Sequence, residues 1–183
     1  MSLVMSIVTT ANRTRRFTQT DPAQIAEILG SLKRAAIIFS ARSLVVAGEH
    51  STELFSPRAI TRIEIETALD LSPYLPPAWV PDIRALGPTD VTGDSRIDDQ
   101  HIASRVDCFF EGGDTLATWI ESGRPGSHSE RSQRLVSLFE QPLISYLPSA
   151  GGIGLINPAN LTRLQFATTL SDPPAGAWHL REA

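Results

Sequence analysis

Residues 54–69 and 155–170 carry the same pattern of side chains, and this match constrains the fold more than any other feature of the chain. The two segments align at a constant spacing of 101 residues, as between Thr61 and Thr162. Identical residues fall at Leu54/Leu155, Pro57/Pro158, Thr61/Thr162, Arg62/Arg163, Thr67/Thr168 and Leu69/Leu170. In both segments apolar residues alternate with polar ones, which predicts strands with one buried face. A few strands alone bury too little apolar surface to be stable, so we expect the two segments to pack together.

Each matching segment follows a stretch with the pattern of an amphipathic helix. In residues 21–32, Asp21 and Pro22 provide a helix start, and the apolar residues Ile25, Ile28, Leu29 and Leu32 recur at helical spacing. Residues 127–139 show a second helix start and a second apolar stripe. Two interpretations remain open: one unit was duplicated, or two amphipathic patterns resemble each other without a common origin.

These patterns predict an α+β protein, in which two pseudo-symmetric repeats of a helix plus antiparallel strands pack into one compact unit. The expected order is an N-terminal arm (1–20), a first repeat (21–72), a connecting region (73–126) and a second repeat (127–183). The first repeat is expected to contain a β-hairpin made of residues 37–39 and 44–46. The connecting region combines a proline-rich connector, an acidic loop and a central hairpin that turns at Gly112-Gly113. A helix over residues 114–121 is the alternative to that hairpin.

Composition narrows the classes of function. A net charge of −4 in 183 residues argues against a nucleic-acid-binding protein, which normally carries a basic stripe. Residues 13–17 form a short arginine-rich stretch, which we interpret as a terminal arm. A single cysteine, Cys108, favours a reducing compartment, and we find no signal peptide or apolar run long enough to span a membrane. Only one of the 16 basic residues is a lysine, Lys33, which is typical of a GC-rich bacterial genome. We expect a cytoplasmic bacterial protein.

The candidate ligand-binding residues are Arg62 and Arg163, which occupy the same position in the two matching segments. If the repeats pack about a pseudo-twofold axis, the two guanidinium groups converge on a small anion between them. The alternative is a solvated strand face on which Arg62 lies close to Glu64 and Glu66.

Other groups with potential chemistry lack the required pattern. Asp98, Asp99 and His101 are metal-ligand types, but their spacing matches neither a calcium loop nor a zinc site. Residues 151–154 are rich in glycine and precede a strand, so we expect a turn there instead of a phosphate-binding loop. Cys108 lies on the apolar face of its predicted strand and is expected to be a buried, unreactive thiol. We therefore expect no catalytic residue, no bound metal and no cofactor.

Two function classes remain. The first is a non-enzymatic interaction or adaptor protein, with a protein partner or with itself as a homodimer through an exposed strand edge. The second is a regulatory domain that holds a small anion or nucleotide between the repeats through Arg62 and Arg163.

Overall fold

The computed structural model describes residues 2–48, 51–75, 82–90, 92–97, 101–123, 130, 136–168, 173, 176–178 and 180. Strands make up 44% of the chain and helical residues 21%, with three β-sheets and, within the described ranges, one α-helix. The chain is therefore mainly β. The predicted α+β class, with two helix-plus-strand repeats, is wrong.

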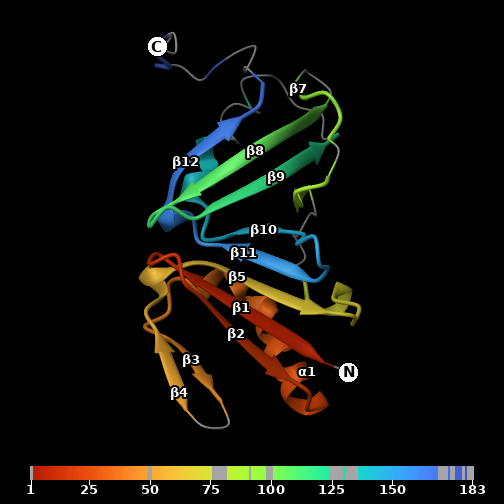
Figure 1. Cartoon of the computed structure of the whole chain (residues 1–183), viewed down its shortest axis with the longest axis vertical. Coiled ribbons are helices and arrows are strands. Elements are labelled where there is room, and N and C mark those ends of the chain that lie inside the picture. The colour runs from red at the N-terminus through yellow and green to blue at the C-terminus, as the bar shows by residue number, and fades with distance from the viewer. Residues whose placement is uncertain are drawn as a thin grey trace.

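The first sheet has five strands in the order β10-β11-β5-β1-β2 and occupies the lower half of Figure 1. All its pairings are antiparallel. Its strands are β1 (Leu3–Thr9), β2 (Thr14–Gln19), β5 (Ile60–Thr67), β10 (Ile144–Tyr146) and β11 (Ile153–Ile156). Strands from the N-terminal and C-terminal parts of the sequence thus share one sheet. Strand β1, which lies between β5 and β2, was not anticipated, although Leu3 and Ile7 on one face of it are both buried.

The second sheet contains four strands in the order β12-β8-β9-β6, and a short fifth strand, β7, pairs with β8. These strands are β6 (Ile83–Ala85), β7 (Arg96–Ile97), β8 (Ile102–Phe110), β9 (Thr115–Ser122) and β12 (Leu161–Phe166). Strands β8 and β9 form the predicted hairpin, so the alternative helix over residues 114–121 is excluded. Gly112 and Gly113 make the turn with φ angles of 84° and 86°, a conformation that favours glycine.

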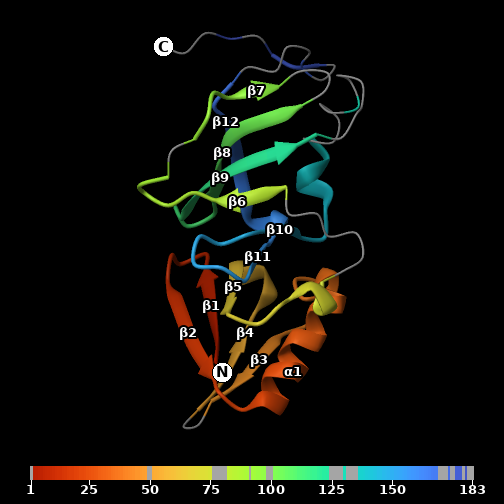
Figure 2. The same cartoon turned by 90° about the vertical axis from the view of Figure 1, so that its right-hand side faces the viewer.

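The α-helix α1 (Pro22–Ser31) begins as the sequence predicts. The Asp21 carboxylate accepts hydrogen bonds from the backbone N–H groups of Ala23 and Gln24. Ile25 and Leu29 point into the core of the first sheet, and the helix lies against that sheet in Figure 2. Within the part of the chain that the structure describes, no helix is both long enough and apolar enough to cross a membrane.

A predicted strand at residues 37–39 is wrong. The helix passes directly into the 3₁₀ helix η1 (Leu32–Ile37), and residues 38–42 form turns and bends. Ile38 and Phe39 pack against the first core from this turn, so their apolar character reflects burial and not strand pairing. The other 3₁₀ helices are η2 (Pro57–Ala59), η3 (Ser72–Tyr74), η4 (Ser137–Glu140) and η5 (Pro158–Asn160). Much of the second helix expected over residues 127–139 lies outside the described residues.

A separate hairpin of two strands, β3 (Leu44–Ala47) and β4 (Thr52–Phe55), lies at the bottom of Figures 1 and 2. Two contacts attach it to β2. Arg15 donates a 3.0 Å hydrogen bond from Nε to Oε2 of Glu53, and the Phe17 and Phe55 rings meet edge to face at 6.2 Å. The hydrogen bonding of Arg15 to Glu53 lowers the pKa of that carboxyl below its usual range.

The two segments that match in sequence adopt the same local structure. Strand β5 pairs with β1, and β12 pairs with β8 in the same register: Ile63 lies opposite Ile7, and Leu164 lies opposite Cys108. The hydroxyl of Thr61 donates to the Val8 carbonyl at 3.1 Å, and the hydroxyl of Thr162 donates to the Phe109 carbonyl, also at 3.1 Å. At a spacing of 101 residues, the pairing of β5 with β1 therefore corresponds to the pairing of β12 with β8. The hairpins β1–β2 and β8–β9 are part of this correspondence.

The same comparison pairs β4 with β11, since each precedes a 3₁₀ helix that begins with proline. Leu54 and Leu155 hold the same position in these two strands, but Leu54 is 68% exposed and Leu155 only 1%. The difference arises because β11 lies between β10 and β5, whereas β4 pairs only with β3 among the described strands. Equal sequence positions therefore have unequal neighbours.

This difference predicts that the same substitution has unequal effects at the two positions. Leu155→Ala should lower the free energy of unfolding by about 2–5 kcal/mol, because it removes a fully buried side chain from the core. Leu54→Ala should change it by less than about 0.5 kcal/mol in dilute solution, as is usual for exposed positions. Urea denaturation followed by circular dichroism measures both. Equal losses in the two variants would contradict the unequal burial of these leucines.

Candidate functional site

Arg62, the first candidate ligand-binding residue, lies in a buried polar cluster where the two sheets meet. We call Arg62, Glu64, Asp114 and Tyr146 the junction cluster. The Arg62 guanidinium contacts the Asp114 carboxylate, and its Nε donates to Oε1 of Glu64 at 3.2 Å. The Arg62 side chain is 14% exposed and the Asp114 side chain 12%. Because Asp114 directly precedes β9 in the β8–β9 hairpin, the ion pair links β5 of the first sheet to the second sheet.

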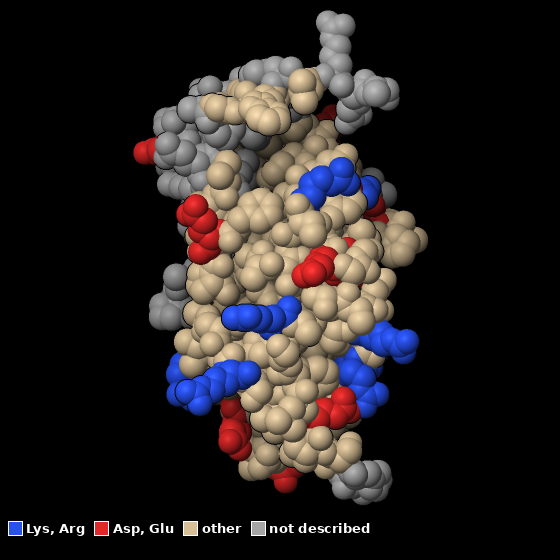
Figure 3. Space-filling view, turned by 90° about the vertical axis from the view of Figure 1, so that its left-hand side faces the viewer, with Lys and Arg blue, Asp and Glu red and all other residues tan. Residues whose placement is uncertain are grey.

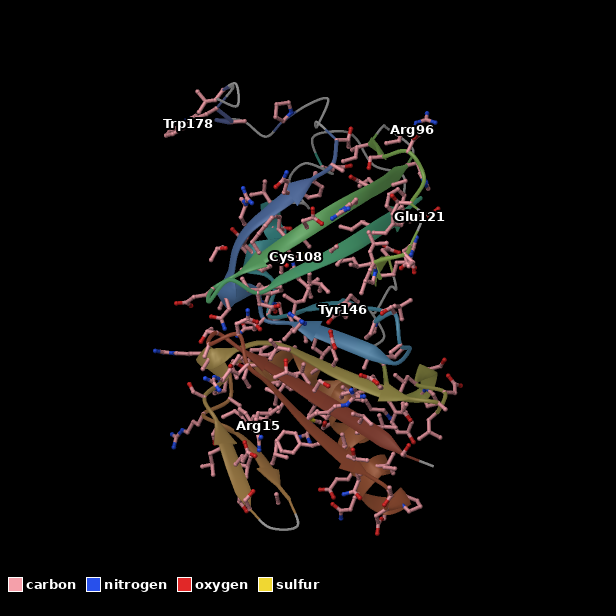
Figure 4. The ribbon with its side chains drawn as sticks, viewed as in Figure 1. Arg15, Arg96, Cys108, Glu121, Tyr146 and Trp178 are labelled. Atoms are coloured by element: carbon pink, nitrogen blue, oxygen red, sulfur yellow. The ribbon has the colours of Figure 1, made fainter. Side chains whose placement is uncertain are left out.

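Tyr146 completes the cluster from β10. Its hydroxyl donates a 2.5 Å hydrogen bond to the same Glu64 oxygen that accepts from Arg62. Burial raises the pKa of the Tyr146 phenol above its usual range, and the negative charge of Glu64 raises it further. The phenol therefore stays protonated and acts as a donor. In Figure 4 Tyr146 lies between the two sheets.

Tyr146 packs directly over Gly154 of the neighbouring strand β11. A Cβ atom built on Gly154 would lie 2.2 Å from carbon atoms of the Tyr146 ring, so no larger residue fits there without moving the ring. This glycine is required for packing, since its backbone leaves the space that the phenol ring fills.

Arg163, the second candidate, lies elsewhere. Its guanidinium carbon is 3.9 Å from the centre of the Phe109 ring, and its side chain is exposed. The Arg62 guanidinium faces the neighbouring ring of Phe110, 5.9 Å away. Phe109 and Phe110 are successive residues of β8, so their side chains project to opposite faces of that strand. The structure therefore does not bring Arg62 and Arg163 into one cleft.

The other candidate groups were Asp98, Asp99, His101 and Cys108. Asp98 and Asp99 lie outside the described residues, and among the described residues no three His, Cys, Asp or Glu side chains are grouped as a metal site would need. Nε2 of His101 lies 3.8 Å from Oε1 of Glu121. The glycine-rich residues 151–152 form the predicted turn, with φ angles of 86° and 95°.

Cys108 is buried, as predicted, and burial raises the pKa of its thiol to about 12. Figure 4 shows it within the second sheet. Because the thiolate is the nucleophilic form, a thiol with this pKa is unreactive near neutral pH.

An apolar pocket of about 290 Å³ lies beside η1. Its walls include Met5, Leu32, Ile38, Leu44, Ile63 and Leu155. Most of these side chains belong to the first core or pack against it. The walls place few polar groups that would orient a ligand, so the pocket does not define a substrate.

A different surface carries exposed apolar side chains on a strand edge. Val45 of β3 and Leu54 of β4 lie directly opposite each other, and they are 55% and 68% exposed. The opposite face of the hairpin carries Leu44, Val46 and Phe55, which pack against the first core. The hairpin is thus apolar on both faces. Sequence reasoning missed this surface, because an alternating strand pattern predicts that apolar residues are buried.

Charged residues do not gather on the side of the molecule where β4 and β12 lie. This side is on the left in Figure 1 and faces the viewer in Figure 3, which shows blue and red side chains scattered over a mostly uncharged surface. The described residues show a mainly β fold, a buried polar cluster whose charged groups contact one another, and an apolar strand edge. Comparisons with protein-family models, curated proteins and solved structures find no match for this chain.

The junction cluster predicts unequal roles for the two arginines. Arg62→Ala leaves the carboxylates of Glu64 and Asp114 without their cation, so it should lower the free energy of unfolding by on the order of 3 kcal/mol. Arg163→Ala removes an exposed cation–π contact and should cost less than about 1 kcal/mol. Thermal or urea unfolding of the two variants makes the comparison. If the free energy of unfolding falls less in Arg62→Ala than in Arg163→Ala, the junction cluster does not stabilise the contact between the two sheets.

Cys108 gives a second prediction. In the folded protein at pH 8 the thiol should react with iodoacetamide far more slowly than in 6 M urea, roughly in proportion to the fraction of protein that is unfolded. Mass spectrometry of the alkylated protein measures both rates. Rapid alkylation of the folded chain would contradict a buried thiol with a raised pKa.

Proposed function

We propose that this chain is a non-enzymatic interaction protein of the bacterial cytoplasm and that the β3–β4 hairpin is its interaction surface. One observation carries the proposal: Val45 and Leu54 form an exposed apolar pair on a hairpin whose strand β4 pairs on one side only within the described chain. Exposed apolar groups on a strand edge are typical of surfaces that bind an extended segment of a partner.

The outward side chains of β4 support the same function. Natural sheet edges are usually protected by charged residues or proline. The exposed residues of β4 are Thr52 and Leu54, which are uncharged, whereas its one charged residue, Glu53, is engaged by Arg15. An uncharged edge is suited to backbone pairing with another strand. The buried thiol of Cys108 is consistent with a reducing compartment such as the cytoplasm.

Site-specific photo-crosslinking tests this function. A benzophenone amino acid replaces Leu54 in the full chain, expressed in a bacterial cytoplasm, and the expected result is a covalent adduct with a polypeptide. The matched control places the same group at Ile37, which is 57% exposed but lies in η1 and not on a strand edge. Adding Val45→Ser to the Leu54 derivative should reduce the adduct. If position 54 gives no adduct, or no more than position 37, the proposed function is wrong.

A further inference from the structure

The molecule already contains one example of how a strand of this type is bound. Strand β11 adds antiparallel to β5, with Leu155 opposite Ile63, and the backbone N–H of Asn157 donates to the Thr61 carbonyl at 2.9 Å. This pairing joins a strand of the C-terminal half to a strand of the N-terminal half. We call it the β11–β5 junction.

The strands that correspond to β11 and β5 at a spacing of 101 residues are β4 and β12. Within the described residues, β4 pairs only with β3 and β12 pairs only with β8. Each therefore has an edge where its counterpart in the β11–β5 junction has a neighbour. Leu54 is exposed at the position where Leu155 is buried.

Within the described part of the chain, the backbone groups at these two edges point outward in matching positions. The N–H of Gly48 donates to the Ser51 carbonyl at 2.8 Å. Because hydrogen-bonded positions alternate along an antiparallel strand, the backbone groups of Glu53 and Phe55 face β3 and those of Leu54 face away from it. On β12, the N–H of Ala167 donates to the Arg105 carbonyl at 2.9 Å, so Leu164 points its backbone groups away from β8. Leu155 and Ile63 point theirs toward each other in the β11–β5 junction.

One chain does not join these two edges. Figures 1 and 2 agree that the β3–β4 hairpin lies at one end of the molecule and β12 in the sheet at the other end. A β4–β12 pairing therefore requires two chains.

We infer that the partner of the β3–β4 hairpin is a second copy of this chain, and that β4 of one molecule adds antiparallel to β12 of the next. Leu54 then lies opposite Leu164, Glu53 opposite Gln165 and Phe55 beside Arg163, as Leu155, Gly154 and Ile156 lie against β5. This inference rests on the proposed function, because it assigns the partner of the same hairpin. The contact joins two different surfaces, so repeated copies form either a closed ring or a filament.

The contact between chains should be weaker than the β11–β5 junction within the chain. Within the chain, the side-chain amides of Asn157 and Asn160 both donate to the Ile60 carbonyl, at 2.9 Å and 2.7 Å. The corresponding positions are Ser56 and Ala59, which carry no amide. Fewer hydrogen bonds and the entropy cost of association predict a reversible assembly that depends on protein concentration.

The contact between chains and the β11–β5 junction differ in one charged residue. Changing that residue should increase association, which gives a further test. Asp114, which contacts Arg62 in the junction cluster, corresponds to Arg13, and Arg62 corresponds to Arg163. Arg13 and Arg163 therefore meet as like charges between chains. Arg13→Asp should restore the ion pair there and shift association to a lower protein concentration.

Sedimentation velocity of the purified full chain tests the assembly. The wild type should exceed its monomer mass of 19.9 kDa increasingly as concentration rises. Leu54→Pro should stay monomeric, because proline removes an N–H that points outward and takes no part in the β3 ladder. Its circular dichroism should match the wild type, and Ile37→Ser should associate normally. A wild type that remains monomeric at all concentrations overturns the inference.

Disulfide trapping tests the register directly. In a Cys108→Ala background, a chain with Glu53→Cys is mixed under mild oxidation with a chain carrying Gln165→Cys. These positions form a non-hydrogen-bonded pair, whose Cα separation of about 4.5 Å suits a disulfide. The control is Arg163→Cys, displaced by two residues on the same strand face. Faster trapping at 165 supports the register, and equal trapping at 163 contradicts it.

The photo-crosslinking experiment separates this inference from the proposed function. An adduct between two copies of this chain supports both. An adduct with another polypeptide, together with a monomeric purified chain, overturns self-association and leaves the hairpin as an interaction surface. No adduct at position 54 overturns both.

Discussion

The pairing of β11 with β5 is the interaction on which the rest of the structure depends. It places strands from both ends of the sequence in one sheet, so that Leu155 and Ile63 share the first core. Backbone hydrogen bonds set the direction and register of this contact, while Ile153 and Leu155 of β11 pack into the first core. Without it the chain would form two smaller sheets, each with an unprotected apolar edge.

The junction cluster strengthens this pairing and makes it specific. Arg62 and Glu64 lie two residues apart on β5 and face the same side of the strand. Asp114 reaches them from the second sheet and Tyr146 from β10, so four side chains from three parts of the chain contact one another. The buried guanidinium of Arg62 contacts carboxylates of its own chain, which makes it a structural group. The same residue type at the corresponding position, Arg163, stays at the surface over an aromatic ring.

Local patterns were sufficient for several elements. The Asp21-Pro22 start of α1, the turn at Gly112-Gly113 and the turn at residues 151–152 depend on neighbouring residues, and each lies where the sequence placed it. The match between residues 54–69 and 155–170 likewise corresponds to shared strand register. Patterns that depend on distant partners were misread. Ile38 and Phe39 are apolar because they pack against the first core, and β1 was not recognised because its place inside the sheet follows from partners elsewhere in the chain.

The sequence by itself determined where the helix and the turns begin, which residues alternate, and that two distant segments have equivalent strands. Those properties follow from local sterics, capping and the two-residue period of a strand. Only the tertiary structure decided which equivalent strand acquires a second neighbour. Leu155 and Leu54 show the same pattern, yet one is buried beside β5 and the other is exposed on β4. Burial is set by the surfaces that meet in space, and a single sequence contains no direct record of those contacts.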